Sequence, residues 1–145
     1  MPALTLAQAA LIVDTALEHG RAQRFKPLAV AVLDAGGHLV AFKREDNASI
    51  LRPQIAEGKA WGVLGMGFGG REFARRVQTG PVFLAALMAA SGGRVVPAPG
   101  GVLIRDREGT IVGSVGISGD TSENDEACAV AGIKATGLSA DTGEI

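Results

Sequence analysis

The sequence predicts an α/β protein of the α+β type, with one antiparallel sheet of about five strands and helices on both faces. Stretches with the apolar, β-branched composition of strands come in pairs, and a short glycine-containing turn joins each pair. Predicted helices separate the two pairs, which argues against a doubly wound parallel sheet. The length of 145 residues, 47% of them hydrophobic and 20% charged, suits a single domain over residues 1–145.

The chain begins with an amphipathic helix over Thr5–His19. Thr5 and Gln8 have the spacing of a capping box, in which each side chain bonds the backbone N–H of the other residue. We expect Gly20 to end this helix, because glycine adopts the left-handed conformation at a helix C-terminus without strain. The apolar face at helical spacing consists of Leu6, Ala9, Val13 and Leu17.

The first predicted hairpin follows this helix. Leu28–Asp34 and His38–Arg44 are apolar runs typical of strands, and Gly36 and Gly37 lie between them. Two glycines there supply the positive φ angles that a tight turn requires, so we expect these strands to pair antiparallel.

Three helices are predicted in the middle of the chain. Pro53 opens the first, which runs to about Leu64, and Arg71–Val77 and Pro81–Ala90 form the next two. The segment Gly65–Gly70 matches the dinucleotide pattern G-x-G-x-x-G literally, but it does not follow a predicted strand as such a site requires. We interpret it as a connector between helices.

The second predicted hairpin joins Val102–Asp106 to Thr110–Ser118, and Arg94–Pro97 is expected to supply a fifth strand. One face of the long strand is unusually small. Such a face either receives a closely packed helix, which we favour, or forms the floor of a pocket. The small face carries Val112, Ser114, Gly116 and Ser118, and the other carries Ile111, Val115 and Ile117.

A final helix is predicted from Ser122 to about Thr136. Ser122 and Asp125 have the spacing of a second capping box. The tail from Gly137 is expected to fray, as chain ends without anchoring contacts do.

Composition excludes several classes of function. The net charge of −1 and the scattered basic residues disfavour binding to nucleic acid. The single cysteine, Cys128, allows no internal disulfide and fits a cytoplasmic protein, and no signal peptide or membrane-spanning run is recognisable. We expect no metal site, because no cysteine or histidine cluster has ligand spacing.

The loop between residues 91 and 101 is a candidate ligand site. Gly92-Gly93 and Gly100-Gly101 lie within ten residues of each other, and glycine pairs allow backbone to approach a ligand closely. Exposed backbone N–H groups in a stiff loop can bind a carboxylate or a phosphate, and Arg94 could hold a carboxylate through two hydrogen bonds. Both glycine pairs have an alternative role that involves no ligand. Gly92-Gly93 could cap the preceding helix, and Gly100-Gly101 could form a plain turn.

Three segments are expected to meet at one corner of the sheet. The start of one strand and the end of its hairpin partner are neighbours, so Gly100 and Gly101 should lie beside Ser118. The last helix begins just beyond Ser118, which brings Asp125 and Glu126 to the same corner. Arg94 could enter from the loop and Lys59 from the second helix. In this arrangement the catalytic residues would be Lys59 and Glu126. The ligand would be bound by Arg94, Gly100, Gly101, Ser118 and Asp125.

Several segments together resemble the GlcG/HbpS family, which also includes the C-terminal domain of PduO-type proteins. The similarity runs in the same order from about Leu4 to Gly137. The segments that carry it are Pro27–Phe42, Gly58–Ala60, Gly92–Arg94, Pro99–Val102, Val115–Gly119 and Asp125–Glu126.

The resemblance implies a profilin-like sandwich that forms homo-oligomers; some members of the family bind haem, and others belong to operons that break down small organic acids or diols. If haem binds, His19, His38 or a methionine is the expected iron ligand, and we favour His19 because a helix holds it rigidly. We expect the helical middle of the chain to form the interface between subunits. The apolar side chains expected to be exposed there are Phe68, Phe73, Phe83 and Met88.

Three functions therefore remain open. The first is a small-molecule-binding protein, with haem or a related tetrapyrrole as the first candidate ligand. The alternative is a cofactor-independent enzyme that catalyses proton transfer, elimination or isomerisation on a small carboxylic acid or polar ring compound. A purely structural subunit of a larger enzyme is the third.

Overall fold

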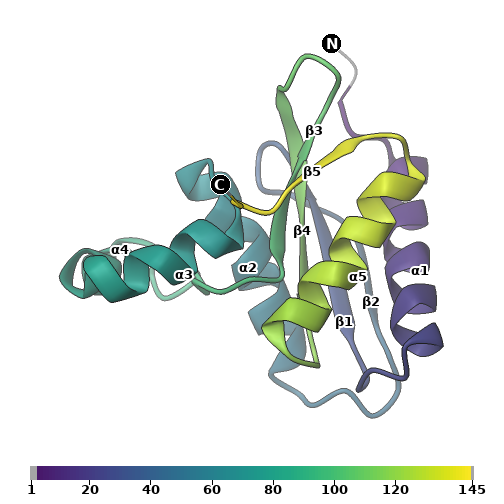
Figure 1. Ribbon diagram of the computed structural model, residues 1–145, viewed down its shortest axis with the longest axis horizontal. Helices are drawn as coiled ribbons and strands as arrows, with labels where there is room; N and C mark the ends of the chain where they lie inside the picture. The colour runs from purple at the N-terminus through teal and green to yellow at the C-terminus, as the bar shows by residue number, and fades with distance from the viewer. Residues whose placement is uncertain (1–2, 145) are drawn as a thin grey trace.

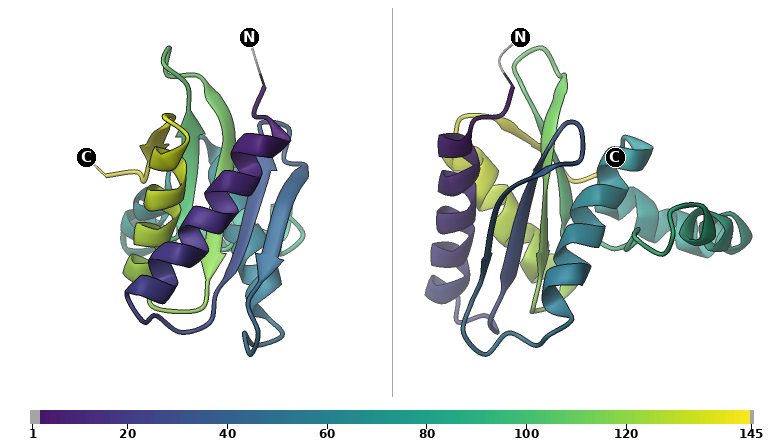
Figure 2. Two further views of the ribbon diagram at one scale, coloured as in Figure 1. Left: turned by 90° about the vertical axis from the view of Figure 1, so that its right-hand side faces the viewer. Right: turned by 180° about the vertical axis from the view of Figure 1, so that it is seen from behind.

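The computed structural model describes residues 3–144 and confirms the predicted α+β class, with a five-stranded antiparallel sheet in the order β2-β1-β4-β3-β5. Helices α1 and α5 cover one face of the sheet and α2 covers the other, while α3 and α4 project beyond it as an arm (Figures 1 and 2). The elements are α1 (Leu6–Ala22), β1 (Ala29–Asp34), β2 (Leu39–Arg44), α2 (Arg52–Met66), α3 (Gly70–Thr79), α4 (Pro81–Ala90), β3 (Gly101–Arg105), β4 (Ile111–Ser118), α5 (Ser122–Ala135) and β5 (Ser139–Asp141).

The main hydrophobic core lies between the sheet and the pair α1 and α5. It is built from β-branched side chains of the strands and apolar side chains of the two helices, including Ile12, Val30, Ile104, Ile117 and Ile133. A smaller cluster on the other face includes Val63, Leu103 and Phe73. Phe73 is only 1% exposed, so the prediction that it belongs to an exposed apolar patch is wrong, whereas Phe83 is 53% exposed as predicted.

Both ends of α1 show how local sequence shapes the helix. The capping box between Thr5 and Gln8 is present as predicted. The prediction that Gly20 ends the helix is wrong, because α1 continues to Ala22 and Arg24 takes the positive φ of 60° instead. A Cβ atom on Gly20 would lie 2.7 Å from Leu28 Cδ1, so this glycine allows α1 to approach the chain just before β1.

The fifth strand comes from the C-terminal tail. β5 pairs with β3, and Arg105 Nε donates to Asp141 Oδ2 at 2.9 Å. The predictions of a fifth strand at Arg94–Pro97 and of a frayed tail from Gly137 are therefore both wrong. Residues 94–96 lie along α2 instead, where Val96 N donates to Gly58 O at 3.2 Å.

The small face of β4 receives α2, as predicted. A Cβ atom on Gly116 would collide with the backbone of α2 at Ala56, and Ser114 Oγ donates to Ala60 O at 2.8 Å. The predicted alternation fails only at the start of the strand, where the register with β3 shifts between Ile104 and Arg105. Because of this bulge, Ile111 packs in the α2-side cluster and Val112 packs in the main core.

The helix boundaries around the sequence Gly65–Gly70 confirm a connector. Gly67 ends α2 with φ 76°, and α3 begins at Gly70. At the start of α5, the cap is Thr121 rather than the predicted Ser122, since the Thr121 side chain accepts a hydrogen bond from Asn124 N.

Candidate functional site

Lys59 of α2 and Asp125 of α5 form a buried ion pair at the corner of the sheet. Lys59 is 4% exposed and Asp125 1% exposed. Lys59 Nζ donates to Asp125 Oδ2 at 3.2 Å and to Ile117 O at 2.9 Å, and Asp125 Oδ1 accepts from Asp120 N at 3.0 Å. The pair therefore joins α2, β4 and the start of α5 through satisfied hydrogen bonds.

Burial dominates the electrostatics of this pair. It lowers the pKa of the Lys59 ammonium, and the Asp125 carboxylate opposes that shift only in part. It also raises the pKa of Asp125, against the attraction of Lys59. Both directions mean that removal from water outweighs the mutual attraction, so deleting one partner would leave an uncompensated buried charge, at about 3–5 kcal/mol.

The structure brings most of the predicted corner together. Ile117 N donates to Gly100 O at 3.0 Å, Gly101 pairs with Gly116, and Arg52 Nη1 donates to Ser118 Oγ at 3.0 Å. The space above Gly100 is filled, because a Cβ atom there would lie 2.8 Å from Lys59 Nζ. These residues meet as expected, but Lys59 packs into the space that a ligand would need.

Glu126 is held by an arginine that the sequence pattern did not single out. Arg71 of α3 donates from Nε to Glu126 Oε2 at 2.9 Å and from Nη2 to Oε1 at 2.6 Å. The Glu126 side chain is 7% exposed and that of Arg71 is 42% exposed. This two-pronged contact ties α3 to α5 and engages both carboxylate oxygens.

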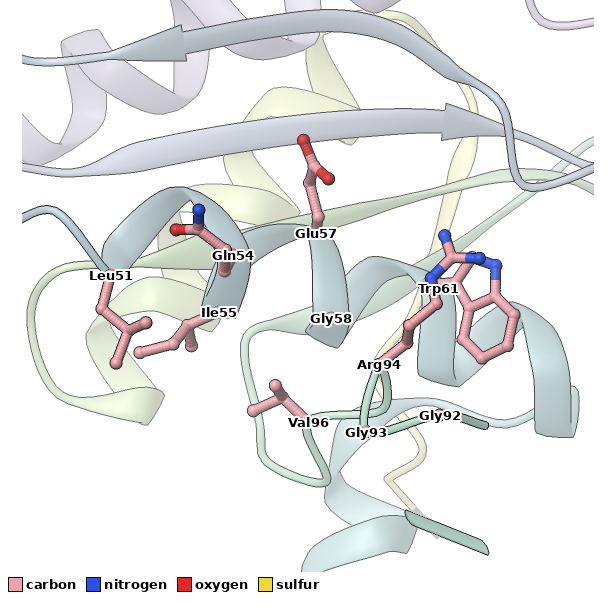
Figure 3. A pocket seen from close by; sticks show the side chains of 10 residues that line it. All are labelled: Leu51, Gln54, Ile55, Glu57, Gly58, Trp61, Gly92, Gly93, Arg94 and Val96. Atoms are coloured by element: carbon pink, nitrogen blue, oxygen red, sulfur yellow. The ribbon is translucent and has the colours of Figure 1, made fainter. Parts of the chain in front are cut away.

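Arg94 does not join the corner. Its guanidinium stacks on the ring of Trp61, 4.1 Å from the ring centroid, and among the described residues it makes no hydrogen bond or ion pair with the corner residues. Arg94 and Trp61 border a cavity of about 360 Å³ between α2 and residues 92–96 (Figure 3). Its lining consists of Leu51, Gln54, Ile55, Glu57, Gly58, Trp61, Gly92, Gly93, Arg94 and Val96.

The glycines beside Arg94 cap a helix. Gly92 and Gly93 have φ angles of 66° and 80°, which favour glycine. Gly92 N donates to Ala89 O and Gly93 N to Met88 O, so their N–H groups complete the end of α4. The capping alternative is therefore confirmed for this pair, and an anion in the cavity would rely on side chains.

The two histidines differ in their surroundings. His19 is partly buried near the end of α1, with its ring edge-on to Phe25, and within residues 3–144 its ring nitrogens make no hydrogen bond. His38 has a side chain that is 80% exposed, and its Nδ1 lies 3.1 Å from Asp34 Oδ1. The backbone N–H of His38 also donates to Asp34, and this contact is the largest cause that lowers the pKa of Asp34.

The described part of the chain shows neither a metal-binding cluster nor a membrane-spanning helix. Residues 3–144 contain no group of three or more His, Cys, Asp or Glu side chains arranged to hold a metal ion. No helix in that range is both long and apolar enough to cross a membrane.

Comparison with curated proteins finds two relatives called corrinoid adenosyltransferase PduO. The protein from Citrobacter freundii is 32% identical over 99 residues, which are 68% of this chain and 29% of the relative. The protein from Salmonella typhimurium is 33% identical over 106 residues, which are 72% of this chain and 31% of the relative. The chain thus spans less than a third of the length of either relative.

Solved structures resemble this chain over nearly its whole length. A PduOC–haem complex superposes with a TM-score of 0.86 at 28% identity, covering 99% of this chain and 100% of that one. Klebsiella pneumoniae protein ORFY gives 0.79 at 27% identity, over 90% and 88% of the chains. HbpS also gives 0.79, at 24% identity over 93% and 91%, which is a likeness of fold.

The family model for HbpS-like haem-degrading proteins matches residues 4–134. This range includes the corner at Lys59 and Asp125, the cavity at Arg94 and both histidines. The chain belongs to the HbpS-like family.

Proposed function

We propose that this protein binds haem and that His19 is the iron ligand. The observation that carries the proposal is the similarity to the PduOC–haem complex, with a TM-score of 0.86 over 99% of this chain. The relative was solved with haem on the same fold, and the family model that matches this chain describes haem-degrading proteins.

The surroundings of His19 fit a haem. Its ring nitrogens are unpaired within the described residues, and α1 provides a rigid mount beside Phe25. Arg24 and Lys26 follow within seven residues and are exposed, so they can meet the negatively charged propionates. An imidazole on the iron sets the redox and ligand-binding properties of the group.

His38 is the second candidate ligand. Its Nδ1 is engaged by Asp34, and among the described residues its Nε2 has no hydrogen-bond partner. A carboxylate behind an imidazole commonly orients a metal ligand. We favour His19 because it lies on a helix and is partly buried, whereas the His38 side chain is 80% exposed on a turn.

Titration with hemin separates these alternatives. We expect wild type to develop a Soret band with saturation, and His19→Ala to bind at least about tenfold more weakly because one iron–imidazole bond is lost. His38→Ala is the matched control and should keep the wild-type spectrum. An unchanged spectrum and affinity in both variants would exclude a histidine ligand.

The alternative enzyme is less favoured by the geometry. Lys59 is covered by Gly100 and bound to Asp125, so it does not face an open substrate site. Glu126 borders a pocket between α5 and the C-terminal segment, but both of its carboxylate oxygens already accept from Arg71, so it is not a free base. The proposal further includes a homo-oligomer that uses the α3–α4 arm and, from the single buried cysteine, a cytoplasmic location.

A further inference from the structure

We infer that the cavity between α2 and residues 92–96 binds a small monocarboxylate with an apolar body, and that Arg94 holds its carboxylate. This site is separate from the proposed haem site, which uses α1 on the opposite face of the sheet. The inference therefore stands or falls independently of haem binding.

Arg94 is prepared to receive an anion. Its guanidinium lies over the ring of Trp61, 4.1 Å from the ring centroid, and within residues 3–144 it makes no hydrogen bond and no ion pair. Stacking occupies the face of the guanidinium but leaves the N–H groups on its edge available. A carboxylate can bind that edge through two parallel hydrogen bonds.

The cavity walls are fixed by close packing. A Cβ atom on Gly58 would lie 2.6 Å from Arg94 O, and Val96 N donates to Gly58 O, so α2 and the 92–96 segment are held together. Trp61 also lies against the turn between β1 and β2, since a Cβ atom on Gly37 would lie 3.4 Å from its Cδ1 and Nε1 atoms. The stacked pair therefore has a defined position before any ligand arrives.

The distribution of side chains defines the class of ligand. Figure 3 shows Arg94 and Trp61 at one end of the cavity and the apolar side chains of Leu51, Ile55 and Val96 toward the other. A ligand with its carboxylate on Arg94 would thus extend an apolar body over these side chains. The volume of about 360 Å³ suits a compound of about the size of benzoate.

Glu57 argues against ligands with more than one negative charge. It lines the same cavity, forms no ion pair with any described residue, and its carboxylate points away from Arg94 (Figure 3). Among the described residues that line the cavity, Arg94 is the one cation, so a dicarboxylate or phosphate would bring a second negative charge that no lining side chain neutralises. The cavity therefore favours a monoanion.

The single tryptophan of the chain makes the test direct, because Trp61 borders the cavity and is the only source of tryptophan fluorescence. We expect benzoate to change this fluorescence with saturation, at a Kd of about 1 mM or tighter. Benzamide, which has the same shape without the charge, and inorganic phosphate should give no saturable change. Absence of saturation with benzoate would overturn the inference.

Variants identify the residue responsible. Arg94→Gln should weaken benzoate binding by about tenfold or more, and Arg94→Lys should be intermediate, because lysine keeps the charge without the planar pair of donors. Arg76→Gln is the matched control, since Arg76 stacks on Phe68 at 4.6 Å outside the cavity. Equal effects of Arg94→Gln and Arg76→Gln would contradict the assignment.

A second variant and two further titrations test the inference even if Arg94→Gln does not fold. If Arg94→Gln fails to fold, Gln54→Glu adds a negative charge to the cavity wall without touching the stacked pair, and it should weaken benzoate binding. Calorimetric titration provides a readout that does not depend on Trp61. Displacement of bound benzoate by hemin would show that the two ligands share one site, and this result would overturn a separate site.

Discussion

Cys128 lies in the main core on α5, and none of its surface is exposed. Burial raises the pKa of its thiol from 9.0 to about 12, and the nearby carboxylates of Asp125 and Asp120 add to the effect. Because the folded-state pKa is the higher one, the stability that this group contributes is complete below about pH 9. It is lost progressively as the pH rises through about 12.

We expect urea denaturation to show this loss. Between about pH 8 and pH 10.5, wild type should lose roughly 2 kcal/mol more of its unfolding free energy than Cys128→Ala, which lacks the titrating thiol. Below about pH 9 the alanine variant is expected to be less stable because of the cavity it creates, so the comparison rests on the difference in slope. Parallel pH profiles for the two proteins would contradict the assignment.

At the same scale, the sequence indicated some side-chain partners and concealed others. The apolar neighbours of Lys59 in the sequence left pairing with a carboxylate, catalysis and an exposed ammonium all open, and the structure shows it buried and paired with Asp125. Arg71 gave no such signal, because its partner Glu126 is 55 residues away and only the docking of α3 beside α5 brings them together. Arg94 was expected at the corner, but it stacks on Trp61 instead, because the position of its side chain depends on how the 92–96 segment packs on α2.

At the scale of elements, glycines in α2 show why this helix lies so close to its neighbours. A Cβ atom on Gly58 would approach Val96 Cγ2 to 2.5 Å and Arg94 O to 2.6 Å, whereas Gly65 in the same helix has nothing within 4 Å. Helix propensity favours alanine at both positions by about 1 kcal/mol. The two positions therefore differ in the space that neighbouring atoms leave for a side chain, not in helix propensity.

Alanine substitutions at these two positions should therefore have opposite effects. Gly58→Ala should lower the unfolding free energy by about 1–3 kcal/mol, because the backbone oxygen of Arg94 cannot move away without disturbing the 92–96 segment. Gly65→Ala should raise it by roughly 0.5–1 kcal/mol. Thermal and urea denaturation measure both, and a stabilised Gly58→Ala protein would show that α2 packs less tightly than described.

Elements with a strong local pattern were predicted well, and those defined by distant contacts were not. The hairpins and α4 carry their own turn and cap residues. β5 consists of Ser139, Ala140 and Asp141, which have low strand propensity, and it exists because β3 offers an unpaired edge. Arg94–Pro97 has the better strand composition but lies beside α2, where no strand edge is available to it.

At the scale of the whole molecule, the α3–α4 arm exposes apolar surface that packing within a single chain does not account for. All ten residues of α4 are apolar, yet only Leu84 is buried, and Val82 and Phe83 are 83% and 53% exposed. The start of α3 is tied to α5 through Arg71 and Glu126, whereas α4 stands away from the sheet and its covering helices (Figures 1 and 2). An exposed helix of this composition is typical of a surface that is covered in an assembly.

We therefore expect a homo-oligomer that depends on α4. Light scattering at micromolar concentration should give wild type a mass of at least two chains, and the double substitution Val82→Glu with Phe83→Glu should reduce it, since buried charges oppose association. Leu6→Glu is the matched control, because Leu6 is 67% exposed on α1 and lies outside the arm. A monomeric wild type would refute the assembly. If Leu6→Glu dissociates the oligomer as much as the double substitution does, the interface includes surface outside the arm. Burial between subunits would then not specifically explain why α4 is apolar.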